Sequence, residues 1–430
     1  MSVASDLRSA RKVIANALRS RNTRRQLATE LLTRPAPAAG TIRIAVYFAD
    51  TPVNLYQVRQ WYGPLAELAA AHPVAIITRS PGASLRLLEE SPVPVVYCRS
   101  VTDLEWFIDR QDIRIVLYVN QNTKNFQMFR YGRMWHVFVN HGESDKMYMT
   151  TNQFKAYDYA FVAGQAALDR LSRKLWDFDV DRKAIPIGRP QADHLTGAPP
   201  YAPDGRTVVL YAPTWEGDRP TAAYGSIASH GVALTAAVLA SPAHRLIYRP
   251  HPRSGVLDPE YRAANQRIIG AIAAANARDP KAQHVFDDGP GLGWQLAEAD
   301  VAITDISAMV YDRLATGKPV VVTRPSSPEA EVDEDGFLGS ADWLTTADAP
   351  GVLAVLDRVQ NDPGARENLE FWASHHFGDI APGAATRRFH EAIEQLMTEW
   401  ARNAALHAGD RPDHAGDGAD DDDDEGMPGT

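Results

Sequence analysis

The sequence has one cysteine, Cys98, among its 430 residues. A single cysteine excludes an internal disulfide framework and is typical of proteins in a reducing compartment. No apolar run reaches the ~18 residues that a membrane-spanning helix needs, and the first residues lack the apolar core of a secretory signal. We therefore expect a cytoplasmic protein.

Several motifs of cofactor and metal chemistry are missing as well. The sequence has no complete GxGxxG, which argues against a dinucleotide oxidoreductase, and it has no Walker motif, HExxH or paired CxxC. The neighbouring His375 and His376 look like a metal pair, but adjacent side chains point apart and only Asp379 lies close by in the sequence. We expect neither a metal nor another cofactor.

Charge is distributed unevenly along the chain. The formal net charge is −10, and residues 409–430 hold nine acidic groups against Arg411 alone, so this stretch supplies about −8 of it. We interpret 409–430 as a solvated, disordered tail. Residues 1–34 are basic, and their helical apolar spacing predicts an amphipathic helix before a linker at 35–40. Such a helix lies on an anionic membrane surface or packs on the protein body, and both alternatives stay open.

From Ile42 onward, short apolar runs alternate with helix-like stretches. This alternation predicts an α/β fold with doubly wound parallel sheets. One set of elements occupies residues 41–195 and a second occupies 207–408, with a Gly- and Pro-rich linker at 196–206. The sequence therefore predicts two Rossmann-like domains that face a cleft.

The clearest strand–helix–strand unit lies between Ala299 and Pro325. Thr304, Asp305 and Ser307 stand in it where a buried strand ends and a helix begins. A helix start at the carboxyl end of a parallel strand favours anion binding. From this unit alone, simple capping of the helix by Asp305 or Ser307 is an equal alternative.

Three further polar clusters follow predicted strands. They are His141 with the loop Glu143, Ser144, Asp145 and Lys146; Thr214 with its neighbours; and Arg249, His251 and Arg253. Because parallel strands end at one edge of a sheet, all four clusters can face the same cleft. Their cationic groups suit a phosphorylated, anionic substrate, although each histidine alone is also compatible with a structural role.

The order of these motifs resembles the CDP-glycerol glycerophosphotransferases, which include teichoic-acid glycerophosphate polymerases and primases and related capsule polymerases. The shared succession, over roughly residues 42–396, is HG with a following lysine, YAPTW, RPHP, TDISAMVYD, GKPVVV, FGD and GAATR. The resemblance implies a GT-B arrangement, a CDP-linked donor held mainly by the second domain, and peripheral attachment to the inner face of the cell membrane.

The resemblance also implies residue roles. His141 matches the family's presumed base and His251 its donor-phosphate histidine, while the pairs Asp305 with Ser307 and Thr386 with Arg387 match groups that face the nucleotide diphosphate. After His-Gly the family commonly has Thr-Pro-Leu-Lys. Here the loop is Glu143-Ser144-Asp145 with Lys146 kept at its spacing, which leaves the acceptor open.

We therefore predict transfer of glycerol phosphate, or a similar alditol phosphate, from a CDP-activated donor to a lipid-linked or polymeric hydroxyl acceptor, with release of CMP. The predicted catalytic residues are His141, His251 and Lys146, and the predicted phosphate site adds Arg249, Arg253, Thr214, Thr304, Asp305, Ser307, Thr386 and Arg387. No nucleic acid partner is expected. The alternatives are a GT-B glycosyltransferase or epimerase acting on nucleotide sugars, and a non-catalytic donor-binding scaffold.

Overall fold

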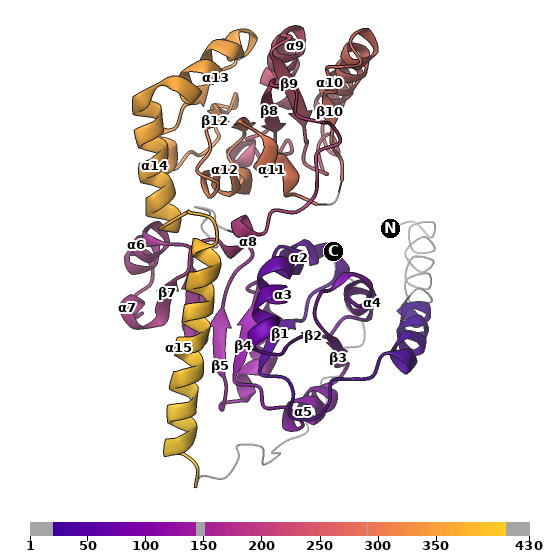
Figure 1. Cartoon of the computed structure of the whole chain (residues 1–430), viewed down its shortest axis with the longest axis vertical. Coiled ribbons are helices and arrows are strands. Elements are labelled where there is room, and N and C mark those ends of the chain that lie inside the picture. The colour runs from indigo at the N-terminus through magenta and orange to yellow at the C-terminus, as the bar shows by residue number, and fades with distance from the viewer. Residues whose placement is uncertain (1–19, 143–150, 290, 410–430) are drawn as a thin grey trace, which may run out of the picture.

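The computed structural model describes residues 20–142, 151–289 and 291–409 and contains two parallel β-sheets, one above the other in Figure 1. The prediction of an α/β fold with two parallel-sheet units is confirmed. The predicted boundaries of these units stay predictions.

The first sheet has seven strands in the order β3-β2-β1-β4-β5-β6-β7, all parallel. Its strands are short and rich in β-branched and aromatic residues, and helices cover both faces, as parallel sheets require. The strands are β1 (Ile44–Phe48), β2 (Val74–Thr78), β3 (Val95–Tyr97), β4 (Ile115–Tyr118), β5 (Trp135–Phe138), β6 (Tyr159–Val162) and β7 (Ala184–Pro186). The helices are α2 (Tyr56–Arg59), α3 (Tyr62–Ala71), α4 (Pro81–Glu90), α5 (Val101–Asp109), α6 (Gln165–Lys174), α7 (Val180–Lys183) and α8 (Pro190–Asp193).

The second sheet has six parallel strands in the order β10-β9-β8-β11-β12-β13. They are β8 (Thr207–Ala212), β9 (His244–Tyr248), β10 (Val285–Phe286), β11 (Val301–Thr304), β12 (Val320–Thr323) and β13 (Trp343–Leu344). The helices are α9 (Val232–Ala240), α10 (Pro259–Arg278), α11 (Trp294–Glu298), α12 (Ala308–Leu314), α13 (Val352–Asn361) and α14 (Pro363–Phe377). In each sheet the strand order reverses once, between β1 and β4 and between β8 and β11, where α/β folds bind ligands.

The last helix, α15 (Ala384–Leu406), returns to the first sheet (Figure 1). Phe389, Ile393 and Leu396 have no exposed surface and belong to the same apolar cluster as strands β1, β2 and β4. The indole N–H of Trp135 donates to the carbonyl of Leu396 at 3.1 Å. The sequence-based division placed this helix with residues 207–408, but its packing joins it to the first sheet.

Part of the predicted N-terminal helix lies in the described region. Residues 20–33 are helical, and Leu27 on this helix is buried against the body of the protein. The arginines Arg21, Arg24 and Arg25 are exposed. The rest of the predicted helix and nearly all of the acidic tail lie outside the described residues. Among those described, no helix has the length and apolar character of a membrane span.

Candidate functional site

The turn that carries His141 begins where β5 ends, at the carboxyl edge of the first sheet. Asn140 adopts a positive φ of 55°, a conformation that asparagine tolerates better than most residues. The indole N–H of Trp61 donates to the carbonyl of Asn140 at 2.5 Å, and the Asn140 side-chain amide donates to the carbonyl of Gly142 at 2.5 Å. These two hydrogen bonds fix the direction in which His141 leaves the strand.

A hydrogen bond of the His141 ring selects one of its two neutral tautomers. Its Nδ1–H donates to the carbonyl of Val119 at 2.9 Å, so the lone pair of the neutral ring lies on Nε2. Burial lowers the pKa of His141, the Val119 carbonyl raises it, and the Arg189 guanidinium lowers it again, with a net decrease. His141 is therefore neutral at pH 7, with Nε2 able to accept a proton. The ring of Tyr56 lies edge-on to it, with centroids 5.7 Å apart.

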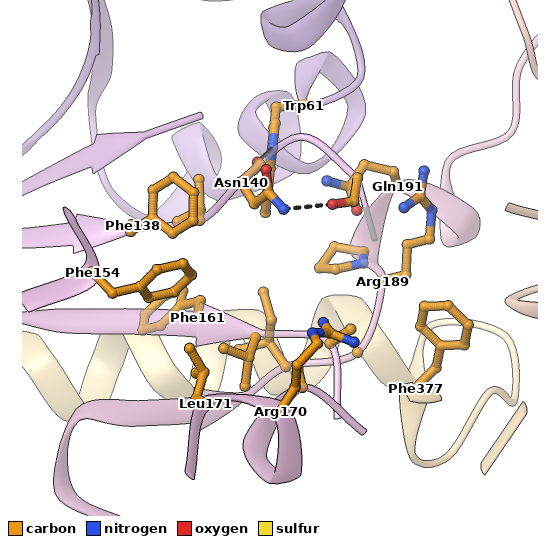
Figure 2. A pocket seen from close by; sticks show the side chains of 18 residues that line it. Trp61, Phe138, Asn140, Phe154, Phe161, Arg170, Leu171, Arg189, Gln191 and Phe377 are labelled. Carbon is orange, nitrogen blue, oxygen red and sulfur yellow. Dashed lines mark hydrogen bonds between the residues drawn. The ribbon is translucent and has the colours of Figure 1, made fainter. Parts of the chain in front are cut away.

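A small cavity lies beside this turn (Figure 2). It measures about 40 Å³ and is lined by Asn140, Gly142 and Arg189 among other residues. Figure 2 shows Phe138 and Phe154 at one end. Nucleotide-sized ligands occupy pockets of roughly 300 Å³ or more, so this cavity does not hold the donor. The predicted acceptor loop, Glu143 to Lys146, lies outside the described residues.

Asp305 stands at the switch point of the second sheet, but it faces the protein interior. Its side chain has no exposed surface and accepts hydrogen bonds from the N–H of Thr214 at 2.7 Å, the N–H of Ser226 at 3.0 Å and the hydroxyl of Thr323 at 2.5 Å. Burial raises its pKa to about 6, although these hydrogen bonds act in the opposite direction. In this structure Asp305 positions the Thr214 loop and is not a surface for a ligand. Thr304 is equally buried.

Ser307 caps helix α12. Its hydroxyl oxygen accepts a hydrogen bond from the N–H of Met309 at 3.3 Å, so Ser307 is the helix cap that was one of the two alternatives predicted for this position. Ser307 remains partly exposed at the carboxyl edge of the sheet. Asp305 and Ser307 therefore differ, because only the serine is accessible.

The loop after β9 presents His251 and Arg253 to solvent. The N–H of Arg253 donates to Nδ1 of His251 at 3.1 Å, so a neutral His251 carries its proton on Nε2, the opposite tautomer to His141. The guanidinium carbon of Arg253 lies 3.9 Å from the centroid of the Trp215 ring. A neutral His141 thus accepts a proton at Nε2, whereas a neutral His251 donates from Nε2.

Glu216 anchors the His251 loop, a role that the sequence reasoning missed. Its carboxylate accepts from the N–H groups of Gly255 at 2.8 Å, Leu257 at 2.8 Å and Asp258 at 3.1 Å. Burial raises the pKa of Glu216, but these backbone donors outweigh it and the pKa falls below its ordinary value. The only sequence signal was its position next to YAPTW.

Arg249 is paired within the protein. Its guanidinium forms an ion pair with Asp287 and donates to the carbonyl of Gly289 at 3.0 Å. Both side chains of the ion pair are largely buried. The pair supports the edge of the second sheet, and the cation of the RPHPR motif that faces outward is Arg253.

Thr386 ties the start of α15 to the end of α8. Its N–H and its hydroxyl both donate to the carboxylate of Asp193, at 2.8 and 2.9 Å, and the N–H of Gly383 donates to the same carboxylate at 3.0 Å. Asp193 thereby caps α15 from the end of the first half. Thr386 is buried, whereas Arg387 is exposed and lines a separate cleft of about 610 Å³ between α3, α8 and α15. Within 20–142, 151–289 and 291–409, no three His, Cys, Asp or Glu side chains are grouped to hold a metal ion.

Comparisons with solved structures show the fold. The chain superposes on a putative UDP-N-acetylglucosamine 2-epimerase from Listeria monocytogenes at 15% identity and TM-score 0.53, over 87% of this chain and 99% of that one. It superposes on the wall teichoic acid polymerase TagF at 13% identity and TM-score 0.52, over 94% and 99%. It superposes on a glycosyltransferase from Rickettsia africae at 11% identity and TM-score 0.50, over 83% of this chain and 99% of that one. At these identities the likeness supports a GT-B fold and no more.

A comparison with sequence families is more specific, while a search of the curated proteins gave no match. Residues 136–329 match the family model described as CDP-glycerol:poly(glycerophosphate) glycerophosphotransferase. This segment contains the His141 turn, the Thr214 loop, the His251 loop and the start of α12. The resemblance predicted from the motifs is therefore confirmed, and the segment that holds the strand-end site is similar to the CDP-glycerol glycerophosphotransferases.

Proposed function

We propose that this chain transfers glycerol phosphate, or a closely similar alditol phosphate, from a CDP-activated donor to a hydroxyl acceptor. The observation that carries the proposal is the family match over residues 136–329, because this one segment holds both His141 and His251. The opposite tautomers of the two rings support a division of labour between them.

The proposed reaction breaks the phosphoanhydride bond of the donor and joins its β-phosphorus to the acceptor oxygen, which makes a phosphodiester. The acceptor hydroxyl oxygen attacks the β-phosphorus of the donor, and the bond from that phosphorus to the bridging oxygen breaks, so that CMP leaves with the electron pair. Nε2 of His141 takes the proton of the hydroxyl. A positioned base of this kind contributes roughly 10²- to 10⁴-fold in rate.

The second half supplies the groups for the phosphates. A neutral His251 donates from Nε2–H, and Arg253, stacked on Trp215, adds a cation where charge builds on the phosphoryl oxygens. Glu216 holds the backbone of this loop in place. Lys146 and the loop Glu143 to Asp145 keep their predicted roles at the catalytic centre and toward the acceptor.

The acceptor is a hydroxyl of a lipid-linked or polymeric component of the cell envelope, which requires contact with the inner membrane surface. The basic residues of 1–34 support a peripheral contact, and Arg21, Arg24 and Arg25 are exposed on the described part of this helix. Vesicles with anionic lipid should co-sediment the full chain at low salt. Replacing these three arginines with serine should release it, and unchanged binding would overturn the membrane contact.

The activity is tested by incubating the full chain with CDP-glycerol and a lipid-linked glycerol phosphate acceptor and measuring CMP. His141→Asn and His251→Asn should each lower turnover by about 10²-fold or more, while the exposed His407→Asn serves as a matched control. Release of UDP from UDP-sugars instead of CMP would favour the glycosyltransferase alternative. Absence of nucleotide release from every donor would favour the scaffold.

A further inference from the structure

Arg189 connects the two halves of the molecule through a buried ion pair. It follows β7 and Gly188, where a φ of 78° turns the chain toward α8. Its guanidinium pairs with the carboxylate of Asp312 on α12, and the two side chains are only 10% and 9% exposed. The pair therefore joins the first half to the helix that begins at Ser307 in the second.

The same guanidinium lies against the His141 turn. A β-carbon placed on Gly142 would be 3.7 Å from Nη1 and 4.0 Å from Nη2 of Arg189, which is ordinary van der Waals contact. Figure 2 labels Arg189 in the lining of the cavity beside this turn. The charge of Arg189 also lowers the pKa of His141, as expected for a cation close to the ring. Arg189 thus lies beside the residue that follows the proposed base.

Asp312 is the complementary half of this arrangement. It lies on α12, the helix that follows Asp305 and is capped by Ser307. Burial raises the pKa of Asp312, and the Arg189 guanidinium lowers it. A carboxylate buried to this extent stays ionised only with a cation beside it, so each member of the pair holds the other in place.

We propose that Arg189 is a positioning residue for phosphoryl transfer. By pairing with Asp312, it fixes α12 of the donor side against the His141–Gly142 turn of the acceptor side, so that base and donor phosphates keep one spacing. This inference rests on the proposed function for its catalytic meaning. The mechanical part, a link between the halves, is independent of the substrate.

A positioning role and a purely stabilising role of Arg189 lead to different kinetic results. Removing either member leaves the other buried without its partner, so Arg189→Gln and Asp312→Asn should each loosen the link. Misplacement by about 1 Å costs up to about 10²-fold in rate, so we expect turnover to fall tenfold or more. The donor contacts only the second half in this scheme, so the dissociation constant of CDP-glycerol should change by less than about threefold, well below the loss in rate.

Two measurements on the full chain test it. Glu89 on α4 and Glu260 on α10 are both exposed, so nitroxides attached to Glu89→Cys and Glu260→Cys report the distance between the halves by double electron–electron resonance. Arg189→Gln and Asp312→Asn should each broaden that distance distribution. The double variant should broaden it no further than either single variant, and Arg189→Lys should give a narrower distribution than Arg189→Gln. Arg358→Gln is the matched control, because its ion pair with Asp342 at 2.5 Å lies within the second half.

Each outcome decides a separate question. An unchanged distance distribution in both single variants overturns the link, and a loss of donor affinity equal to the loss of turnover overturns the positioning role. If the parent chain transfers nothing from CDP-glycerol, the proposed function fails, while the distance measurement alone still decides whether Arg189 holds the halves together. Thermal unfolding of each variant, recorded first, confirms that the comparison is made on folded protein.

Discussion

Replacement of Asp305 tests how the donor side of the site is built. Its buried carboxylate accepts from the N–H groups of Thr214 and Ser226 on one oxygen and from the Thr323 hydroxyl on the other. Asparagine has the same shape: its oxygen can accept both N–H groups, and its amide can donate to the Thr323 hydroxyl oxygen. Alanine instead removes every acceptor and leaves two buried N–H groups without partners.

The magnitude follows from the pKa of Asp305. The folded pKa of about 6 exceeds the ordinary value of 3.8, so the folded state binds this proton more tightly than the unfolded state. Stability from this group is therefore fully present below pH 3.8 and is lost as pH rises through about 6. The loss amounts to about 3 kcal/mol, roughly half of it between pH 5 and 8. Asp305→Asn lacks this loss, while Asp305→Ala costs about 2–4 kcal/mol for the unsatisfied donors.

Urea unfolding followed by circular dichroism at pH 5, 6, 7 and 8 gives the free energies of unfolding. The free energy of unfolding of Asp305→Asn, relative to that of the parent, should rise by roughly 1.5 kcal/mol between pH 5 and 8. Asp305→Ala should be the least stable of the three at every pH. A difference between Asp305→Asn and the parent that does not change with pH would refute the buried charge. Equal stability of the asparagine and alanine variants would refute its role as a hydrogen-bond acceptor.

Three other predictions concern the loop, the last helix and the base. Glu216→Gln should raise the KM for CDP-glycerol about tenfold in steady-state kinetics, because one of three backbone donors loses its acceptor; an unchanged KM would contradict the anchoring of the His251 loop. Ile393→Ala should lower the free energy of unfolding in urea by about 2–5 kcal/mol, whereas Leu406→Ala, at an exposed position, should change it little. Equal effects of the two substitutions would contradict the packing of α15 on the first sheet. Because burial lowers the pKa of His141 and the base must be neutral, kcat/KM should fall at acid pH with a midpoint below the ordinary imidazole value of ~6.5; a midpoint above that value would contradict the assignment.

The alternation of strands and helices was enough to predict the two sheets, because parallel strands buried on both faces have an unmistakable apolar pattern. The same pattern placed His141, Thr214, His251 and Ser307 at strand ends. It could not show that Asp305 faces inward, since a carboxylate after a strand looks the same in sequence whether it meets a ligand or distant backbone N–H groups.

The missed features depend on contacts between residues far apart in the chain. The apolar face of α15 predicts burial, but periodicity does not say which sheet it covers. The pairing of Arg189 with Asp312 and the capping of α15 by Asp193 are likewise invisible, because each joins one half of the molecule to an element that follows much later. The role of Glu216 could not be predicted, because the sequence around it does not show that its carboxylate accepts hydrogen bonds from three backbone N–H groups about forty residues later.

The proposed transfer is tested most directly by the release of CMP from CDP-glycerol by the full chain with a lipid-linked hydroxyl acceptor, compared between the parent and His141→Asn. We expect acceptor-dependent release of CMP by the parent and a loss of about 10²-fold or more in the variant, with its fold and its affinity for CDP-glycerol retained. Equal rates in the two proteins, or release of UDP from a UDP-sugar with none of CMP, would contradict it.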